Sequence, residues 1–210
     1  MDRKKDVQNV STHLYYYEDE FTEEDLEERL LYLNKEINEQ TIDEIAYHIY
    51  RFNRHDVGKE RDERKPIIIF INSPGGSVVD GFGVVDAIET SITPVYTVNM
   101  AACESMGFLI YIAGHKRFAF PRSEFLLHEI VTGGSGTASK VRDRIEFESV
   151  QLDEVIRKHV TGKTRISEKT YAKKAHNEWY FFAEEAKNLG VVDYIIGTDC
   201  TIDDLFRREK

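Results

Sequence analysis

The strongest constraint on the fold is a run of β-branched and aromatic residues, PIIIFIN (66–72), followed at once by SPGG (73–76). A continuous apolar run of this length is typical of a strand that is buried on both faces, as in a parallel sheet. The next segment, SVVDGFGVVDAIE (77–89), predicts a helix, and Ser77 with Asp80 three residues later resembles a capping box. A strand, a glycine turn and a helix in this order indicate an α/β unit.

The rest of the chain alternates strands and helices in the same way. We expect strands at residues 29–37, 66–72, 94–100, 118–121, 124–131 and 191–196. We expect helices at residues 40–54, 77–89, 105–114 and 168–174, and a long amphipathic helix at about 139–160 that Gly162 closes. The pattern predicts an α/β fold with a parallel β-sheet core and flanking helices.

Composition divides the chain into three parts. Residues 1–28 form a polar N-terminal arm, residues 29–199 a single folded domain, and residues 200–210 a C-terminal tail. The acid-rich stretch EDEFTEEDLEER is typical of a solvated or mobile arm. The three adjacent tyrosines of HLYYYED instead favour docking on a neighbouring subunit, and both interpretations stay open.

Charge and cysteine content exclude several classes of protein. The formal net charge of −10 argues against a nucleic-acid-binding protein, because phosphate binding needs clustered Lys and Arg. No apolar run reaches the roughly 18 residues of a membrane span. The N-terminal MDRKKDVQNV lacks the apolar segment of a secretory signal. Cys103 and Cys200 form neither a metal-ligand spacing nor a disulfide framework. We therefore expect a cytoplasmic location, with no nucleic acid or membrane partner.

Ser105 stands at the start of the expected helix SMGFLIYIAG. The N-terminus of a helix gathers free backbone N–H groups and the positive end of the helix dipole. That position suits a helix cap, and it equally suits a nucleophile beside an oxyanion site. The local pattern is Cys103-x-Ser105-x-Gly107, which differs from the G-x-S-x-G of the α/β-hydrolases and disfavours that fold.

Three further features have both a structural and a chemical interpretation. The paired glycines of INSPGGS (71–77) form a tight turn or let the backbone approach a ligand, but they lack the Lys-Ser/Thr ending of a phosphate loop. His128 ends an apolar strand, either as a hydrogen-bonded structural histidine or as a catalyst. Glu178 precedes an aromatic cluster, so it is either a surface residue or a buried carboxylate that needs a partner.

Taken together, these pieces are far more specific than any one of them. Four segments follow one another in the order and spacing of the Clp protease proteolytic subunit, ClpP: FINSPGGSV, MAACESMGFLIYIAG, RFAFPRSEFLLH and FFAEEAKNLGVVD. The resemblance runs from about Arg29 to Gly197. It implies the ClpP/crotonase-like fold, with a protruding handle helix, and the activity of a serine-type endopeptidase.

The resemblance also implies roles for single residues. Ser105 falls on the family's nucleophile and His128 on its general base, which agrees with the need of a serine hydroxyl for a base. Gly76 and Met106 fall on the two backbone N–H donors of the oxyanion hole. The segment EIVTGG after His128, with Ile130 and Gly133, is expected to pair with an extended substrate, as in β-strand addition.

The sequence departs from the family pattern in four places. Glu178 stands where the family usually has the aspartate of the triad, and the adjacent Asn177 is a rival group for orienting His128. Glu104 replaces a small residue directly before the nucleophile. His128 is followed by Glu-Ile instead of Gln-Pro. The loop at 54–65 and the N-terminal arm are long for the family, so the chain is identified as a divergent member.

The family's assembly gives further expectations. It forms two stacked heptameric rings around a chamber, and a helix from about Ser139 would form the handle between the rings. The flexible GGSGTA before it would let the handle shift. Unfolded proteins and peptides are the substrates, delivered by a hexameric AAA+ ATPase. The ATP belongs to that partner, so no cofactor is expected here. Ile68 and Phe70 fall at positions associated with the apolar docking pocket for the ATPase.

Two rival functions are kept open. One is a catalytically impaired ClpP-like subunit that is structural within a mixed ring, which Glu104 and Glu178 leave possible. The other is an acyl-CoA enzyme of the crotonase type, which shares the core fold and uses paired backbone N–H groups as an oxyanion hole. The Ser105–His128 pair argues against both rivals.

Overall fold

The computed structural model describes residues 23–131 and 135–206 of the 210-residue chain. Most of the expected N-terminal arm lies outside this range. Residues 23–28 are helical, and Leu26 packs against the main core. The boundaries predicted for the arm, the domain and the tail stay predictions.

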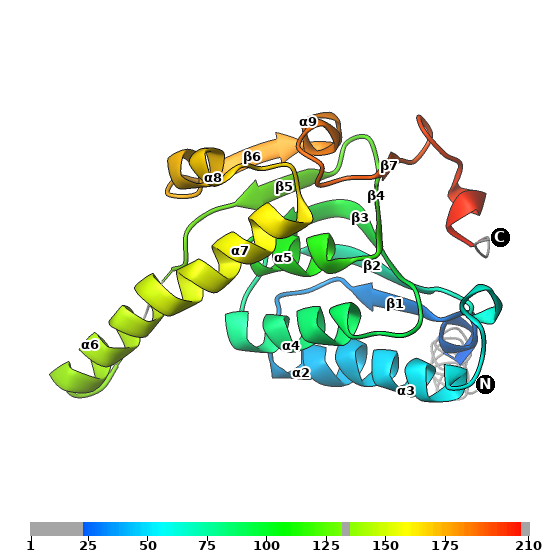
Figure 1. The fold of residues 1–210 in the computed structure, drawn as a ribbon, viewed down its shortest axis with the longest axis horizontal. Coiled ribbons are helices and arrows are strands. Elements are labelled where there is room, and N and C mark those ends of the chain that lie inside the picture. Colours follow the sequence, from blue (N-terminus) through cyan, green and yellow to red (C-terminus); the bar gives the residue numbers. More distant parts are fainter. Residues whose placement is uncertain (1–22, 132–134, 207–210) are drawn as a thin grey trace, which may run out of the picture.

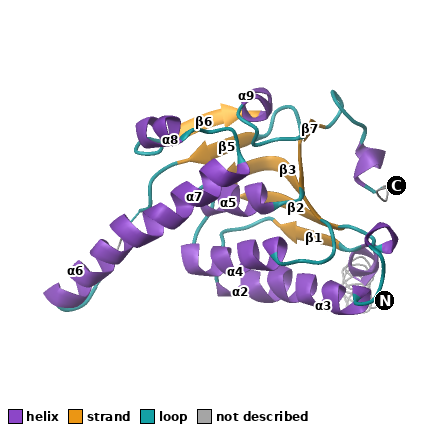
Figure 2. Ribbon diagram, in the orientation of Figure 1, coloured by secondary structure: helices purple, strands orange, loops and turns teal. Residues whose placement is uncertain are grey.

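The described residues form one seven-stranded sheet, shown in Figure 2. Its strands are β1 (Leu30–Leu33), β2 (Ile67–Ser73), β3 (Val95–Glu104), β4 (Lys116–Ala119), β5 (Glu124–Leu127), β6 (Trp179–Phe182) and β7 (Tyr194–Ile195). The order along the main path is β1-β2-β3-β4-β7, and β5 pairs with both β3 and β6. Every pair is parallel except β5–β6. The predicted parallel α/β core is confirmed.

Strand β3 is the longest of these strands and has two neighbours on one side. Residues 96–99 pair with β4, whereas residues 102–104 pair with β5. The end of β3 therefore changes its neighbour on this side from β4 to β5, and β5 in turn pairs with β6. This fork delivers Glu104 and Ser105 to the point where His128 follows the end of β5.

Helices cover the sheet and connect many of its strands along the chain. They are α2 (Glu39–Thr41), η1 (Ile42–Ala46), α3 (Tyr47–Asp56), η2 (Arg61–Glu63), α4 (Val78–Glu89), α5 (Met106–Ala113), α6 (Ala138–Glu146), η3 (Phe147–Leu152), α7 (Asp153–Lys163), α8 (Glu168–Lys174), α9 (Ala183–Asn188) and η4 (Ile202–Leu205). The capping prediction for α4 is confirmed in one direction, because the Ser77 hydroxyl accepts a hydrogen bond from the Asp80 N–H at 3.4 Å.

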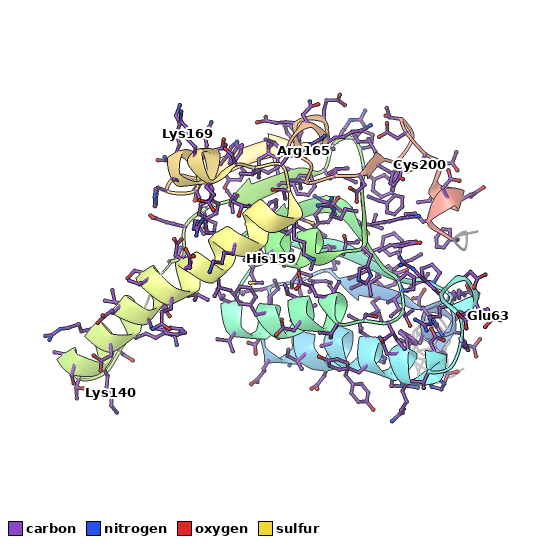
Figure 3. All side chains as sticks on the ribbon, in the orientation of Figure 1. Glu63, Lys140, His159, Arg165, Lys169 and Cys200 are labelled. Atoms are coloured by element: carbon purple, nitrogen blue, oxygen red, sulfur yellow. The ribbon has the colours of Figure 1, made fainter. Side chains whose placement is uncertain are left out.

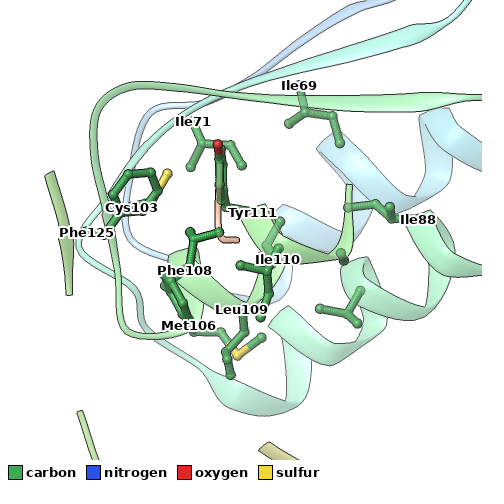
Figure 4. Close-up of a cluster of buried hydrophobic side chains, with 14 of the residues drawn as sticks. Ile69, Ile71, Ile88, Cys103, Met106, Phe108, Leu109, Ile110, Tyr111 and Phe125 are labelled. Atoms are coloured by element: carbon green, nitrogen blue, oxygen red, sulfur yellow. The ribbon is translucent and has the colours of Figure 1, made fainter. Parts of the chain in front are cut away.

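The main core lies between the sheet and the helices α4 and α5. Every residue of α5 is buried, and Figure 4 shows its side chains packed toward Cys103 and Phe125. The rings of Tyr111 and Phe125 meet edge to face at 5.0 Å, and Phe125 stacks on Phe181 at 5.6 Å. A helix with apolar residues on every face is stable only when it is buried on every side, and this explains the complete burial of α5.

Helices α6, η3 and α7 follow one another without a break and project from the body as one long helix, called here the projecting helix (Figure 1). Figure 3 labels Lys140 near its outer end and His159 where it meets the body. There His159 Nε2 lies 3.0 Å from the Leu109 carbonyl of α5. The prediction that Gly162 closes this helix is wrong, because Gly162 lies inside α7, which ends at Lys163. Open space around Gly162 and an unremarkable φ make a glycine unnecessary there.

Two other expectations need correction. The strand expected at 124–131 ends at Leu127, because β3 has no further residue to pair with it beyond Glu104. Strand β6 was not expected at all. Its Trp179 and Phe181 are buried while Tyr180 and Phe182 are exposed, so four aromatic residues conceal a period of two.

The opposite face of the sheet carries a second, smaller core. Ile68 and Phe70 lie there with Leu205 of η4, which is 0% exposed. Within the C-terminal segment a capping box fixes the start of η4: the Asp204 carboxylate accepts hydrogen bonds from the Thr201 N–H and hydroxyl. The two residues expected in a docking pocket, Ile68 and Phe70, therefore belong to a core cluster that also contains Leu205 of the C-terminal segment.

A buried ion pair joins the start of β1 to the end of α3. The Arg29 guanidinium donates two hydrogen bonds to the Asp56 carboxylate, at 2.5 and 2.8 Å, and Lys59 and Thr93 donate further ones. Asp56 is 0% exposed. Burial alone would raise the pKa of Asp56, but these donors outweigh it and hold that pKa well below its usual range.

Replacing Asp56 with asparagine is expected to lower the free energy of unfolding by about 3–5 kcal/mol at pH 7, because it leaves a buried guanidinium without its carboxylate. Since the pKa of Asp56 is lower in the folded than in the unfolded chain, its contribution is present above the unfolded value of 3.8 and is lost as the pH falls below it. Denaturant unfolding at pH 7 and pH 3 measures the difference. Asp62→Asn, at an exposed site, is the control, and an equal effect of both variants at pH 7 would contradict the account.

Candidate active site

Ser105 occupies a strained turn between β3 and α5. Its φ of 54° and ψ of −120° are unusual for a residue with a side chain, and only Arg29 shares a positive φ among the described non-glycine residues. Ser105 stands at the N-cap position, yet its side chain makes no capping hydrogen bond. The interpretation of its hydroxyl as a helix cap is therefore wrong, and the hydroxyl is left available.

The backbone of Ser105 is fixed on both sides. Its N–H donates to the Leu126 carbonyl of β5 at 2.9 Å, and its carbonyl accepts from the N–H groups of Phe108 and Leu109 at 3.1 and 3.3 Å. A non-glycine residue keeps a positive φ only where the surrounding structure over-determines it. These three bonds and the buried helix α5 supply that constraint.

The SPGG turn lies directly against Ser105. A Cβ atom built on Gly75 would lie 2.6 Å from the Ser105 Cβ and 3.0 Å from the Met106 nitrogen, so only glycine fits there. Gly75 has a φ of +95° and Gly76 a φ of +140°. The turn is tied to Ile37, in the loop between β1 and α2, by two hydrogen bonds of 2.8 Å, from the Ile37 N–H to the Gly75 carbonyl and from the Ser77 N–H to the Ile37 carbonyl.

A pocket of about 280 Å³ brings the predicted residues together. Ser105, His128, Gly76, Met106 and Ile130 all line it. Its other walls are Pro74, Val78, Leu109, Leu127, Glu129, Val131 and Ile156. The mostly aliphatic walls suit an apolar side chain of a ligand. Gly133, the other residue expected to bind substrate, lies outside the described residues.

Two backbone N–H groups are candidates for the donors of an oxyanion hole. Met106 is the first residue of α5, so its N–H has no partner within the helix. Gly76 lines the same pocket and begins the connection into α4. Both amides therefore belong to the wall that also carries Ser105, as expected from the sequence. Their role stays a prediction.

His128 and Glu178 stand opposite each other in the strand register. The antiparallel pair β5–β6 ends with Leu127 opposite Trp179, so the next residue on one strand faces the preceding residue on the other. Among Ser105, His128 and Glu178, all within the described residues, no side-chain hydrogen bond is formed. Glu178 instead accepts one from the Tyr180 hydroxyl at 3.3 Å. Catalytic hydrogen bonds are often long in unliganded enzymes and tighten with substrate, so the register keeps Glu178 as the candidate acid.

Asn177 remains the alternative to Glu178. Asn177 and Glu178 are both exposed, but Asn177 precedes the residue that the register places opposite His128. Its backbone N–H donates to the Lys174 carbonyl at 3.1 Å, which closes the turn after α8. The geometry favours Glu178 over Asn177, and the assignment stays a prediction.

Glu104 is surrounded by other carboxylates. Burial raises its pKa, and the negative charges of Glu124 and Glu178 raise it further, while the imidazole of His128 acts in the opposite direction. The sequence analysis identified Glu104 but missed Glu124. The signal was present as the period of two in Glu124, Leu126 and His128, which places these residues on one face of β5 and its extension.

A larger pocket of about 790 Å³ lies elsewhere, between β4 and the end of α7. Several cations line it, but they are paired: Arg117 with Asp193, Lys163 with Glu89 and Lys187 with Asp199. The side chain of Arg165, labelled in Figure 3, donates to the Lys187 carbonyl at 2.5 Å. Because these cations are already paired, we interpret the pocket as structural and do not treat it as a second candidate site.

The family and sequence comparisons agree with one another. The model of the family described as Clp protease matches residues 17–199. The ATP-dependent Clp protease proteolytic subunit 1 of Bacillus cereus is 30% identical over 173 residues, which cover 81% of this chain and 86% of that protein. The proteolytic subunit 2 of a Prochlorococcus marinus strain is 29% identical over 174 residues, which cover 80% of this chain and 82% of that protein.

A solved structure shows the same fold. A mutant of ClpP1 from Listeria monocytogenes matches with a TM-score of 0.74 and 24% identity, over 88% of this chain and 99% of that chain. At this identity the likeness concerns the fold alone. Across residues 23–131 and 135–206, no helix is both long and apolar enough to cross a membrane.

Proposed function

The chain belongs to the Clp protease family, and on that premise we propose that it is a serine endopeptidase that hydrolyses peptide bonds in unfolded proteins and peptides. Its relatives are named as proteolytic subunits. The observation that carries the proposal is the state of Ser105: a strained serine with an uncommitted hydroxyl, in one pocket with His128. A structural serine has no need of the strain.

In the proposed reaction the Ser105 hydroxyl attacks the carbonyl carbon of the scissile peptide bond while His128 takes its proton. The oxyanion that forms accepts hydrogen bonds from the N–H groups of Gly76 and Met106, each worth roughly 3–4 kcal/mol of transition-state stabilisation. His128 returns the proton to the leaving amine, and water then hydrolyses the acyl-enzyme by the same steps in reverse. Glu178 orients the imidazole.

Substrate binding is proposed to use the segment after β5. Glu129, Ile130 and Val131 line the pocket and have no strand partner among the described residues, and Val131 is 82% exposed. An extended peptide that adds a strand here would be held by its main chain. The aliphatic walls at Met106, Leu109 and Ile156 would receive one side chain, so recognition would depend little on the rest of the sequence.

Assembly into two stacked heptameric rings is proposed from the family. The projecting helix supports it, because four apolar side chains along that helix are 43–62% exposed in the single chain: Ile145, Phe147, Val150 and Val155. A second copy of the helix would cover such a surface. The handle shift through GGSGTA stays part of this proposal.

Delivery of substrates by a hexameric AAA+ ATPase is likewise proposed from the family. Ile68 and Phe70 are only 2% and 9% exposed, so neither offers a surface by itself. Tyr32 stacks on Phe70 with ring centroids 5.4 Å apart and is 42% exposed. Of these three residues, Tyr32 is the one that a partner could contact directly. The cytoplasmic location and the lack of a cofactor stay predictions.

A catalytically impaired subunit of a mixed ring is the second candidate. The observation that favours it is that Glu178 accepts a hydrogen bond from the Tyr180 hydroxyl and none from the His128 imidazole. The crotonase-type alternative has no such support, because its chemistry does not need a serine beside a histidine.

The test is to offer the assembled protein two classes of substrate. The first class is peptidase substrates, namely a fluorogenic peptide and an unfolded protein. The second is an acyl-CoA thioester. We expect cleavage of the peptide and of the unfolded protein, and no thioester hydrolysis above the background of Ser105→Ala. Thioester turnover without peptide cleavage would contradict the peptidase proposal and support a crotonase-type activity. Neither activity in the assembled particle would support the impaired subunit.

A further inference from the structure

Glu104 lies on the same face of the sheet as the catalytic pair. Cys103, its neighbour, is 0% exposed and points into the main core, so alternation along β3 turns Glu104 to the other face. Glu104 pairs in register with Leu126, and His128 follows two residues later. His128 is thus a diagonal neighbour of Glu104 on one face of this parallel pair, and the two side chains interact electrostatically.

Four other groups face this side chain from the neighbouring strands. Glu124 comes from β5, Tyr180 from β6, and Glu178 and His128 from the residues next to these strands. Within the described part of the chain Glu104 forms no ion pair with Lys or Arg, and the imidazole of His128 is the group that favours its charged form. The Glu104 carboxyl also shares a side-chain hydrogen bond with Glu124, and an imidazolium at His128 would favour its charged form.

One oxygen of the Glu178 carboxylate already accepts a hydrogen bond, and the residue is exposed. The Tyr180 hydroxyl donates to Glu178 at 3.3 Å. Partial desolvation raises the pKa of Tyr180, and the charge of Glu178 raises it further, so the hydroxyl keeps its proton and stays a donor. The residue in the position of the triad acid thus has a competing partner, while a second carboxylate lies on the same face.

We propose that Glu104 is a second positioning carboxylate for His128, which shares with Glu178 the task of orienting the imidazole. It acts in the step in which the proton of the Ser105 hydroxyl moves to His128. The proton stays on the imidazole, and the carboxylate stabilises the positive charge that forms. The inference rests on the proposed peptidase function, and it gives the acidic residue before the nucleophile a reason to be there.

The test is a double-mutant cycle on kcat and KM for a fluorogenic peptide, with Glu104→Gln, Glu178→Gln and both together. Shared positioning predicts that each single variant lowers kcat by about 10-fold at nearly constant KM. It predicts a loss of about 10³-fold in the double variant, more than the hundredfold of two independent effects. Glu184→Gln, an exposed glutamate on α9, is the matched control and should retain full activity.

Stability separates positioning from a structural effect. Because the pKa of Glu104 is higher in the folded chain, its charge costs stability above the usual value of 4.5, and this cost disappears below it. Glu104→Gln should therefore raise the denaturation midpoint at pH 7, and not at pH 4, while it lowers kcat. Loss of activity together with loss of stability at pH 7 would contradict the proposal.

The failures of the two proposals are distinguishable. If wild type cleaves peptides and Ser105→Ala does not, but Glu104→Gln is fully active in both the wild-type and the Glu178→Gln backgrounds, this inference is wrong and the peptidase function stands. If the effects of the two single variants simply multiply, Glu104 does not share the task of Glu178. If wild type itself is inactive, both proposals fail together.

Discussion

Replacing Ser105 with alanine is expected to lower kcat/KM for peptide hydrolysis by about 10⁴- to 10⁶-fold, the range for loss of a nucleophile in serine proteases. The Ser105 hydroxyl makes no capping bond, so its loss should leave the free energy of unfolding nearly unchanged. The Cβ that packs beside Gly75 is kept in alanine. Steady-state kinetics together with denaturant unfolding measure both effects on the same preparation.

The matched control for this prediction is Ser139→Ala. Ser139 is an exposed serine near the start of α6, and its hydroxyl lies 3.2 Å from that of Thr137. We expect full activity from Ser139→Ala. Retained activity in Ser105→Ala would show that hydrolysis, if present, does not pass through this serine, and a large loss of stability would show that the residue is structural.

Replacing Gly75 with alanine is the second change with a large expected effect. The new Cβ would lie 2.6 Å from the Ser105 Cβ, 2.9 Å from the Glu104 carbonyl and 3.0 Å from the Met106 nitrogen. Contacts this short force the backbone of the turn or of the nucleophile to move. A misplacement of about 1 Å in an active site costs about 100-fold in rate, so we expect kcat/KM to fall by at least that factor.

Gly58→Ala gives a close control. Gly58 has a φ of +85°, close to the +95° of Gly75, and nothing lies within 4 Å of the Cβ it would gain. Both variants carry the backbone cost of a positive φ, about 1–2 kcal/mol, whereas only Gly75→Ala meets a steric clash. Thermal unfolding and peptide hydrolysis of the pair separate the two effects. Equal activities would mean that the SPGG turn does not position the nucleophile.

Local pattern was sufficient for most of the fold. The PIIIFIN run predicted β2, and the stretch before Gly114 predicted α5, because continuous apolar runs usually form buried strands or buried helices. Helix α8 was placed at Glu168–Lys174, as observed. Strand β6 escaped because all four of its residues are aromatic, and the alternation of buried and exposed positions shows only once β5 lies beside it.

The site depended on information that local pattern does not hold. A serine at a helix start is compatible with a cap and with a nucleophile, and the choice depends on the φ of Ser105 and on whether its hydroxyl is engaged. The second core cluster brings Leu205 together with Ile68 and other residues distant in the chain, so no periodicity predicts it. The meeting of Glu104, Glu124 and Glu178 likewise follows from strand order, which the sequence analysis did not assign.

The central claim is that Ser105 is a nucleophile activated by His128. The most direct measurement is to treat the assembled protein with a fluorophosphonate probe and to locate the adduct by peptide mass spectrometry. The account predicts an adduct on Ser105 in wild type, no adduct in Ser105→Ala, and labelling slowed by at least about 100-fold in His128→Ala. An assembled particle in which Ser105 stays unlabelled, or is labelled equally fast without His128, would contradict it.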